Sequence, residues 1–236
     1  MKAACIWEHN GDDSLVYCRD YPGAYARGAT REQALAKIPS ELQAYAAWRG
    51  MALPSSLQPV VVQEKASELC IRDADSDVLF DAECAPLTRA EYEEARRLTM
   101  QSAQSFEQLY RTVPDVDASC LPERSTFYGT VPRTAREMYL HTKNVNEYYF
   151  REIGVAADNV GTIVQCREKG FTLLEQQADF LKNPVLEGSY QEQWSLRKVL
   201  RRFVWHDRIH ARAMYRMALQ TFGPESVPDI FCFLSR

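Results

Sequence analysis

The chain has 236 residues, 46% of them hydrophobic and 25% charged, which is long enough and apolar enough for one large domain or two ordinary ones. Its formal net charge of −4 provides no electrostatic footprint for nucleic acid, whose binding domains are usually basic. Charge appears too early for a secretory signal, and no apolar run approaches the ~20 residues that span a bilayer. We therefore expect a cytoplasmic protein with no nucleic-acid partner and no membrane partner.

The cysteines do not predict a structural cross-link or a zinc knuckle. There are seven of them, scattered along the chain and never in a C-x-x-C pair. A disulfide framework or a cysteine-based zinc site would need regular, close spacings. We expect reduced thiols that pack as small hydrophobic groups. Cys166 lies in a helical stretch, and the sequence does not place it relative to other functional groups.

The first part of the chain predicts strands and one helix. Apolar runs separated by turn residues predict strands over 3–9, 14–19, 24–29, 59–64, 68–72 and 78–81. Thr30 and Gln33 have the spacing of a capping box and open a helix that Gly50 ends. Pro39 lies inside this helix and predicts a kink or a break there. Strands, one helix and further strands together predict a small α+β unit.

Part of this unit resembles a known family. The stretch Pro22-Gly23-Ala24-Tyr25-Ala26-Arg27-Gly28-Ala29-Thr30, followed by Gln33-Ala34-Leu35, resembles the P-G-x-x-x-x-G-x-T-x-x-x-A pattern of HicB-like domains. The resemblance implies a HicB-like α+β module over residues 1–86. We carry over the fold alone, and not the antitoxin or accessory role of that family.

The composition changes after Pro86, and the pattern is then helical almost to the C-terminus. Capping boxes at Thr88 and Thr134 open helices over 89–111 and 134–152. Further helices are predicted over 158–182 and from after Gly188 to near Gly223, with a long loop over 112–133. Four helices, each with one apolar stripe, predict an all-α four-helix bundle over residues 87–236.

Histidines interrupt the apolar stripes of two of these helices. When the last helix is read from Trp194, steps of three and four residues form one core-facing seam: Leu196, Val199, Phe203, His206, His210, Ala213 and Met217. The second helix has a similar seam: Met138, His141, Val145 and Tyr148. His206 and His210 are four residues apart, so their side chains point the same way. The remaining histidine, His9, lies beside a turn and is expected to be exposed.

Three imidazoles in core-facing positions predict a shared metal ion, although a buried histidine can also be hydrogen-bonded structure. Three neutral nitrogens leave at least one coordination position open, which is the arrangement of catalytic rather than structural zinc sites. Nitrogen-rich sites also suit nickel and copper.

The histidine pattern resembles a second family. His141 in the second helix, and His206-x-x-x-His210 in the last, resemble the DinB-like (YfiT-like) metal-binding bundles, as do the flanks Thr134 to Leu140 and Trp194 to Leu200. The resemblance implies a divalent metal, usually zinc or nickel, held by His141, His206 and His210. Family activities include thiol S-transfer with low-molecular-weight thiols, glutathione-independent isomerisation and hydrolysis. A small-molecule substrate or such a thiol, and a homodimer, are compatible with it. The chain departs from the family pattern at residues 211–213, where an Arg-Gly pair is common.

Two hypotheses about function follow. The first is a divalent-metal-dependent enzyme, a thiol S-transferase or a hydrolase, for which the sequence names no general base. Glu137 either caps its helix or orients His141. The alternative is a non-catalytic scaffold that binds a metal or a partner and has a HicB-like recruiting module.

Arginines on the third and fourth bundle helices give two further expectations. Four of them share one side of the last helix and predict a solvated face: Arg197, Arg201, Arg208 and Arg212. Arg167 falls in the apolar stripe of the third helix, so if it is buried it must be paired, which makes it a candidate for binding a substrate anion.

Overall fold

The computed structural model describes residues 2–54, 56–126 and 129–233, and the chain contains both a small N-terminal sheet and five α-helices in this part. It divides into two compact units, Met1–Ala85 with Phe231–Arg236, and Pro86–Ile230. We expected the boundary after residue 86 and the whole C-terminus in the second unit. The division lies one residue earlier, and the chain from Phe231 onward groups with the first unit.

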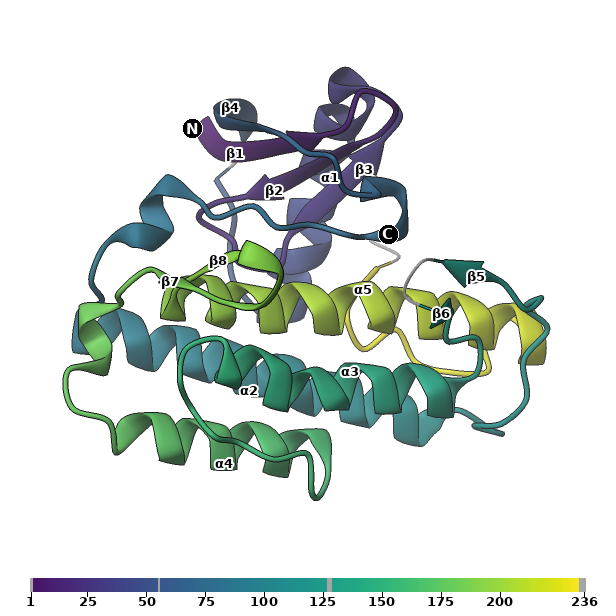
Figure 1. Cartoon of the computed structure of the whole chain (residues 1–236). Coiled ribbons are helices and arrows are strands. Elements are labelled where there is room, and N and C mark those ends of the chain that lie inside the picture. The colour runs from purple at the N-terminus through teal and green to yellow at the C-terminus, as the bar shows by residue number, and fades with distance from the viewer. Residues whose placement is uncertain (1, 55, 127–128, 234–236) are drawn as a thin grey trace. The chain divides into compact units, whose positions relative to one another are not determined.

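The first unit is built on a four-stranded sheet (Figure 1). The strands are β1 (Lys2–His9), β2 (Ser14–Cys18), β3 (Tyr25–Gly28) and β4 (Gln58–Ala66), in the order β3-β2-β1-β4. β1 is antiparallel to β2 and parallel to β4, and β2 is antiparallel to β3. The strands predicted over 3–9, 14–19, 24–29 and 59–64 are confirmed.

Helix α1 (Arg31–Arg49) covers one face of this sheet. It begins where predicted, because the Thr30 side chain accepts a hydrogen bond from the Gln33 backbone N–H. It ends at Gly50, whose φ of 64° is a left-handed conformation that glycine adopts readily. The Arg31 guanidinium lies 5.3 Å from the centroid of the Trp7 ring on β1. The helix continues through Pro39, so the break expected there is not found.

The segment after β4 covers the opposite face, and the strands predicted over 68–72 and 78–81 are wrong. In their place are short 3-10 helices, η1 (Ile71–Asp73) and η2 (Asp81–Cys84). The segment is held by side chains rather than by a strand ladder: Ser76 Oγ donates to the buried Glu8 carboxylate at 2.5 Å, and the Phe80 ring packs edge-on against Tyr17 at 5.5 Å. Apolar residues in a coil that crosses a sheet resemble a strand in sequence.

The second unit contains helices α2 (Arg89–Thr112), α3 (Ala135–Arg151), α4 (Ile163–Glu175) and α5 (Leu196–Phe222). Both α2 and α3 pack against α4 and against α5 (Figure 1). The capping boxes that predicted the starts of α2 and α3 are confirmed, with the Thr88 and Thr134 side chains accepting hydrogen bonds from the third residue of each helix.

Two helix starts differ from the prediction. α4 begins at Ile163 rather than at 158, because Gly161 has a φ of 117° and Thr162 then forms a capping box with Gln165. It ends at Glu175, and the separate 3-10 helix η3 (Phe180–Lys182) occupies the end of the predicted stretch. α5 begins at Leu196, after Ser195 caps it.

Short strands occupy two of the connections. Trp194 belongs to β8 (Gln193–Trp194), which pairs with β7 (Leu186–Glu187), and the 3-10 helix η4 (Ser189–Gln191) lies between them. In the predicted loop over 112–133, β5 (Ser125–Thr126) pairs with β6 (Gly129–Thr130). No helix among the described residues is both long and apolar enough to cross a membrane.

Candidate metal centre

Helix α5 places two histidines on one face, one turn apart. The Ser195 side chain accepts a hydrogen bond from the Lys198 backbone N–H and so fixes where the helix begins. Val199 and Phe203, both fully buried, orient the following turns toward the core. His206 is 8% exposed and His210 is half-buried, and their ring centroids are 4.4 Å apart. The predicted placement of this pair is therefore found.

Helix α3 supplies the third histidine from a position that differs from the prediction. His141 is exposed rather than in the buried seam, although burial by its neighbours still lowers its pKa. The buried side of α3 instead includes Met138, Thr142 and Asn146. Thr142 Oγ1 donates to the Met138 carbonyl at 2.8 Å, and the Asn146 amide donates to the Asp158 carbonyl at 3.0 Å. Because the Thr142 hydroxyl and the Asn146 amide N–H both donate to nearby backbone carbonyls, these side chains can be buried, and His141 lies at the edge of the helix contact.

The three imidazoles nevertheless meet. The His141 ring centroid lies 5.1 Å from that of His206 and 4.6 Å from that of His210. One nitrogen from each ring can be chosen so that all three lie within 4.8 Å of one another. Zinc–nitrogen bonds of about 2.1 Å in a tetrahedral site would put these nitrogens about 3.4 Å apart, so small ring rotations suffice to form a site.

Electrostatics favour the neutral form that a metal requires. Burial lowers the pKa of His206 well below its ordinary value of 6.5, and the nearby His210 and His141 lower it further. Burial, with a smaller contribution from His141, lowers the pKa of His210 to about 3. A neutral imidazole offers a lone pair to a metal, whereas a protonated one does not.

One of the buried side-chain atoms without a hydrogen-bond partner belongs to the cluster. Nδ1 of His206 is buried and has no hydrogen-bond partner in the described part of the chain. Leaving such a group unpaired costs about 1–3 kcal/mol, and a cation shared with the other two rings would remove that cost. The residues present therefore fit a divalent metal. The same three side chains are the only His, Cys, Asp or Glu cluster with this geometry among the residues the structure describes.

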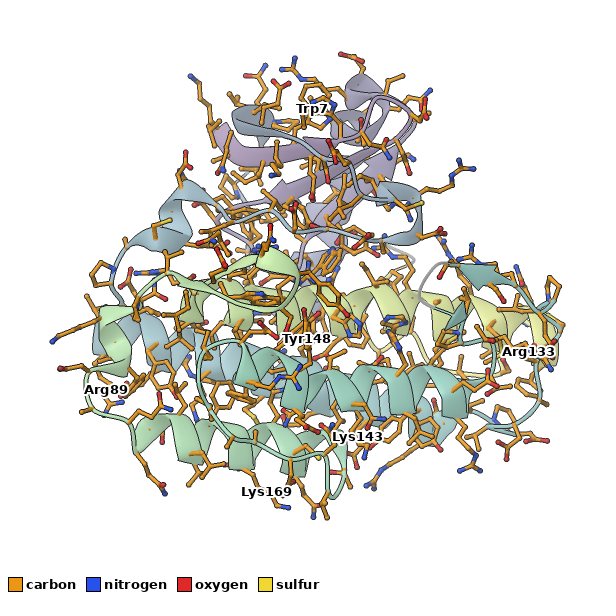
Figure 2. The ribbon with its side chains drawn as sticks, viewed as in Figure 1. Trp7, Arg89, Arg133, Lys143, Tyr148 and Lys169 are labelled. Atoms are coloured by element: carbon orange, nitrogen blue, oxygen red, sulfur yellow. The ribbon has the colours of Figure 1, made fainter. Side chains whose placement is uncertain are left out.

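The surroundings of the cluster are aromatic on the side toward the start of α5. The Tyr149 ring lies edge-on to His206 at 6.1 Å, and the Arg202 guanidinium lies 5.5 Å from the Tyr149 centroid. Tyr148, labelled in Figure 2, packs edge-on against Trp194 of β8 at 5.8 Å. On the other side His141 is exposed, so solvent reaches the cluster from the α3 side.

Other candidate residues have structural roles. The Glu137 carboxylate accepts hydrogen bonds from the backbone N–H groups of Arg133 and Thr134, at 2.8 and 3.1 Å, which lower its pKa. It therefore caps α3. His9 pairs with Glu64 at 3.1 Å and stacks on Trp7, outside the cluster. Cys166 is buried on α4 and is not a member of the histidine cluster.

The arginine expectations have different outcomes. Arg167 is fully buried and paired with Asp207, at 3.2 and 3.3 Å, so its charge is already matched within the chain. The predicted solvated face is wrong, because Arg201 and Arg208 are buried. All residues over 198–208 are buried, and a helix covered on all sides has no solvated stripe. Asp207 was missed: the burial of Arg167 implies an acidic partner, but no spacing in the sequence identifies it.

Comparison with protein-family models, curated proteins and solved structures finds no match to this chain.

Proposed function

We propose that the chain is a divalent-metal-dependent enzyme of the DinB-like type, a thiol S-transferase or a hydrolase, with zinc or nickel held by His141, His206 and His210. The observation that carries the proposal is that imidazole nitrogens from two helices lie within 4.8 Å of one another, and that one of these rings, His206, has a buried nitrogen with no hydrogen-bond partner among the described residues. Three nitrogen ligands leave a position for a water, a substrate or a thiol, as in catalytic sites.

We also propose the family folds that the sequence suggested. For the second unit, a DinB-like four-helix bundle is supported by the packing of α2 and α3 against both α4 and α5, with the histidines on α3 and α5. For the first unit, a HicB-like module is supported by the sheet order β3-β2-β1-β4 with α1 following β3.

A bound divalent cation would supply Lewis acidity, lowering the pKa of a water or thiol toward neutrality or polarising a substrate oxygen. The chain itself contributes three neutral imidazoles, whose protonation is opposed by burial. Exposed His141 leaves the cluster open to a small molecule from the α3 side, while Tyr149 and buried Phe203 close it on the other.

Metal titration tests whether the three histidines bind a divalent metal. Protein stripped with a chelator should bind one equivalent of zinc or nickel by calorimetry. Changing a residue that only supports a ligand typically costs 10- to 100-fold in affinity, so His206→Ala should cost at least about 100-fold. His9→Ala is the matched control, because His9 is engaged with Glu64 in the first unit and should leave binding unchanged.

Turnover assays test whether the metal-loaded protein is an enzyme. Metal-loaded protein should transform at least one member of a panel of low-molecular-weight thiols with electrophiles, and of esters, and His206→Ala should not. Metal binding without turnover would favour the non-catalytic scaffold. Equal metal affinity in the parent, His206→Ala and His9→Ala proteins would overturn the proposed site.

A further inference from the structure

Two buried cysteines face each other across the central strands of the first unit. Cys5 on β1 and Cys18 on β2 are direct partners in the antiparallel pairing, and they are 0% and 1% exposed. Among the strand pairings that the structure describes, this is the one that sets a cysteine opposite a cysteine. The two cysteines belong to the first unit, whereas the three histidines of the cluster belong to the second.

The hydrogen-bond register brings the two side chains close together. The Arg19 N–H donates to the Ala4 carbonyl at 2.9 Å, so Ala4 and Arg19 occupy a hydrogen-bonded position and the next pair, Cys5 and Cys18, a non-hydrogen-bonded one. The Cys18 N–H points the other way and donates to the Ala24 carbonyl at 3.0 Å. Cα atoms in non-hydrogen-bonded pairs are about 4.5 Å apart. Disulfide-linked residues span about 4.4–6.8 Å, so a bond requires little strand movement.

The two thiols are chemically unequal. A side-chain hydrogen bond between the two thiols lowers the pKa of Cys5 and raises the pKa of Cys18 well above its usual value. Burial opposes ionisation of both. Because the thiolate is the reactive form, Cys5 is the nucleophile of the pair and Cys18 is the thiol beside it.

We propose that Cys5 and Cys18 are a reversible redox pair, which a small peroxide oxidises to a disulfide that cross-links β1 to β2. The Cys5 thiolate, having lost its proton to solvent, attacks one peroxide oxygen; the O–O bond breaks, and the other oxygen leaves as hydroxide and takes up a proton. The Cys18 sulfur then attacks the resulting Cys5 sulfenic sulfur. The S–O bond breaks, and the oxygen leaves as water with the Cys18 proton. In total the two thiols give up two hydrogens, and one hydrogen peroxide becomes two waters.

Burial selects the oxidant. Hydrogen peroxide is close to water in size, so brief local opening of the sheet admits it, while larger thiol reagents are excluded from the folded protein. The second step is intramolecular between adjacent strands, and it competes with further oxidation of the sulfenic acid. A disulfide is therefore the expected product.

The sequence offers a direct readout. Trypsin cleaves after Lys2 and Arg19 and releases residues 3–19 as one peptide that contains both cysteines. The full-length folded protein is treated with hydrogen peroxide, quenched, alkylated in denaturant and digested for mass spectrometry. This peptide should lose two hydrogens and escape alkylation, and dithiothreitol applied before alkylation should restore two reactive thiols.

Two variants separate the pair from general oxidation. In Cys18→Ala the sulfenic acid has no adjacent thiol, so the same peptide should carry a sulfenic acid, which dimedone added with the denaturant converts to a stable adduct. Cys166→Ser removes a buried thiol of the second unit and should leave the disulfide yield unchanged. Circular dichroism verifies that each variant is folded. The proposal is overturned if the parent peptide stays fully alkylatable after peroxide, or gains oxygen without losing hydrogen.

Discussion

His206 and Asp207 are neighbours on α5 and belong to two different polar clusters. Asp207 has its counter-charge within the chain: both carboxylate oxygens accept hydrogen bonds from Arg167, whose guanidinium carbon also lies 3.8 Å from the centroid of the Phe203 ring. His206 has a buried nitrogen with no hydrogen-bond partner in the part of the chain that the structure describes, and two other imidazoles lie beside it. The charges of Arg167 and Asp207 compensate each other within the chain, whereas the three imidazoles have the geometry for the metal proposed above.

The largest expected effect comes from breaking the paired cluster. Asp207→Ala leaves the Arg167 charge buried and uncompensated, so the free energy of unfolding should fall by about 3–5 kcal/mol in urea titrations. Asp117→Ala is the matched control, because its ion pair with Arg136 is exposed and screened by water, so its loss should change stability little. Equal losses in the two variants would contradict the structural role of the buried pair.

Acid should destabilise the metal-free protein through the histidine cluster. The folded-state pKa values of His206 and His210 lie below their unfolded value of 6.5, so below that pH the unfolded chain binds more protons than the folded chain does. Stability is fully present above pH 6.5 and is lost as the pH falls toward about 3, the pKa of His210. Each histidine should contribute at most about 1.4 kcal/mol per pH unit.

Urea midpoints measured at intervals from pH 7.5 to pH 5, with and without zinc, would check this slope. The variant His210→Gln should flatten it in the metal-free protein. A slope that His210→Gln leaves unchanged would show that the cluster does not control the acid response.

Replacing the unpartnered histidine should have opposite effects with and without metal. His206→Leu removes a buried polar atom that has no hydrogen-bond partner among the described residues, so metal-free protein should gain about 1 kcal/mol of stability. With metal present the same variant should be less stable than the parent, because it loses the binding free energy. Thermal unfolding of both proteins, each with and without zinc, measures the difference. Destabilisation of similar size in both conditions would indicate that His206 already has a structural partner.

The smallest effect tests whether Glu137 acts on the helix or on the metal ligands. Its carboxylate accepts two backbone hydrogen bonds at the start of α3, so Glu137→Ala should cost about 1 kcal/mol of stability. Metal affinity, measured by calorimetry, should stay the same. A tenfold loss of affinity would instead assign Glu137 to the orientation of His141.

The sequence predicted best where one local signal decides the structure. Thr88 and Thr134 set the starts of α2 and α3 through capping boxes, and the His206–His210 spacing set their common face. The start of α4 can also be predicted from the sequence, because Thr162 and Gln165 form the same capping-box signal, although the helix predicted here begins at Asp158.

Prediction from the sequence failed where packing between distant segments determines the structure. His141 is exposed because Thr142 and Asn146 occupy the buried side of α3, and polar residues give no sequence signal of a buried helix face. The prediction that Arg201 and Arg208 lie on a solvated face is wrong because α5 is buried on every side over residues 198–208. The prediction of strands over 68–81 is wrong because this coil is held on the sheet by a buried side-chain network around Glu8, and such a network has no periodic pattern in the sequence.

The most direct test of the central claim is an anomalous diffraction map from crystals grown with zinc, and with nickel, recorded at the absorption edge of each metal. The account predicts one strong peak at bonding distance, about 2.1 Å, from a nitrogen of each of His141, His206 and His210. An absence of density there in both crystals, or a peak that the His141 ring does not contact, would contradict it.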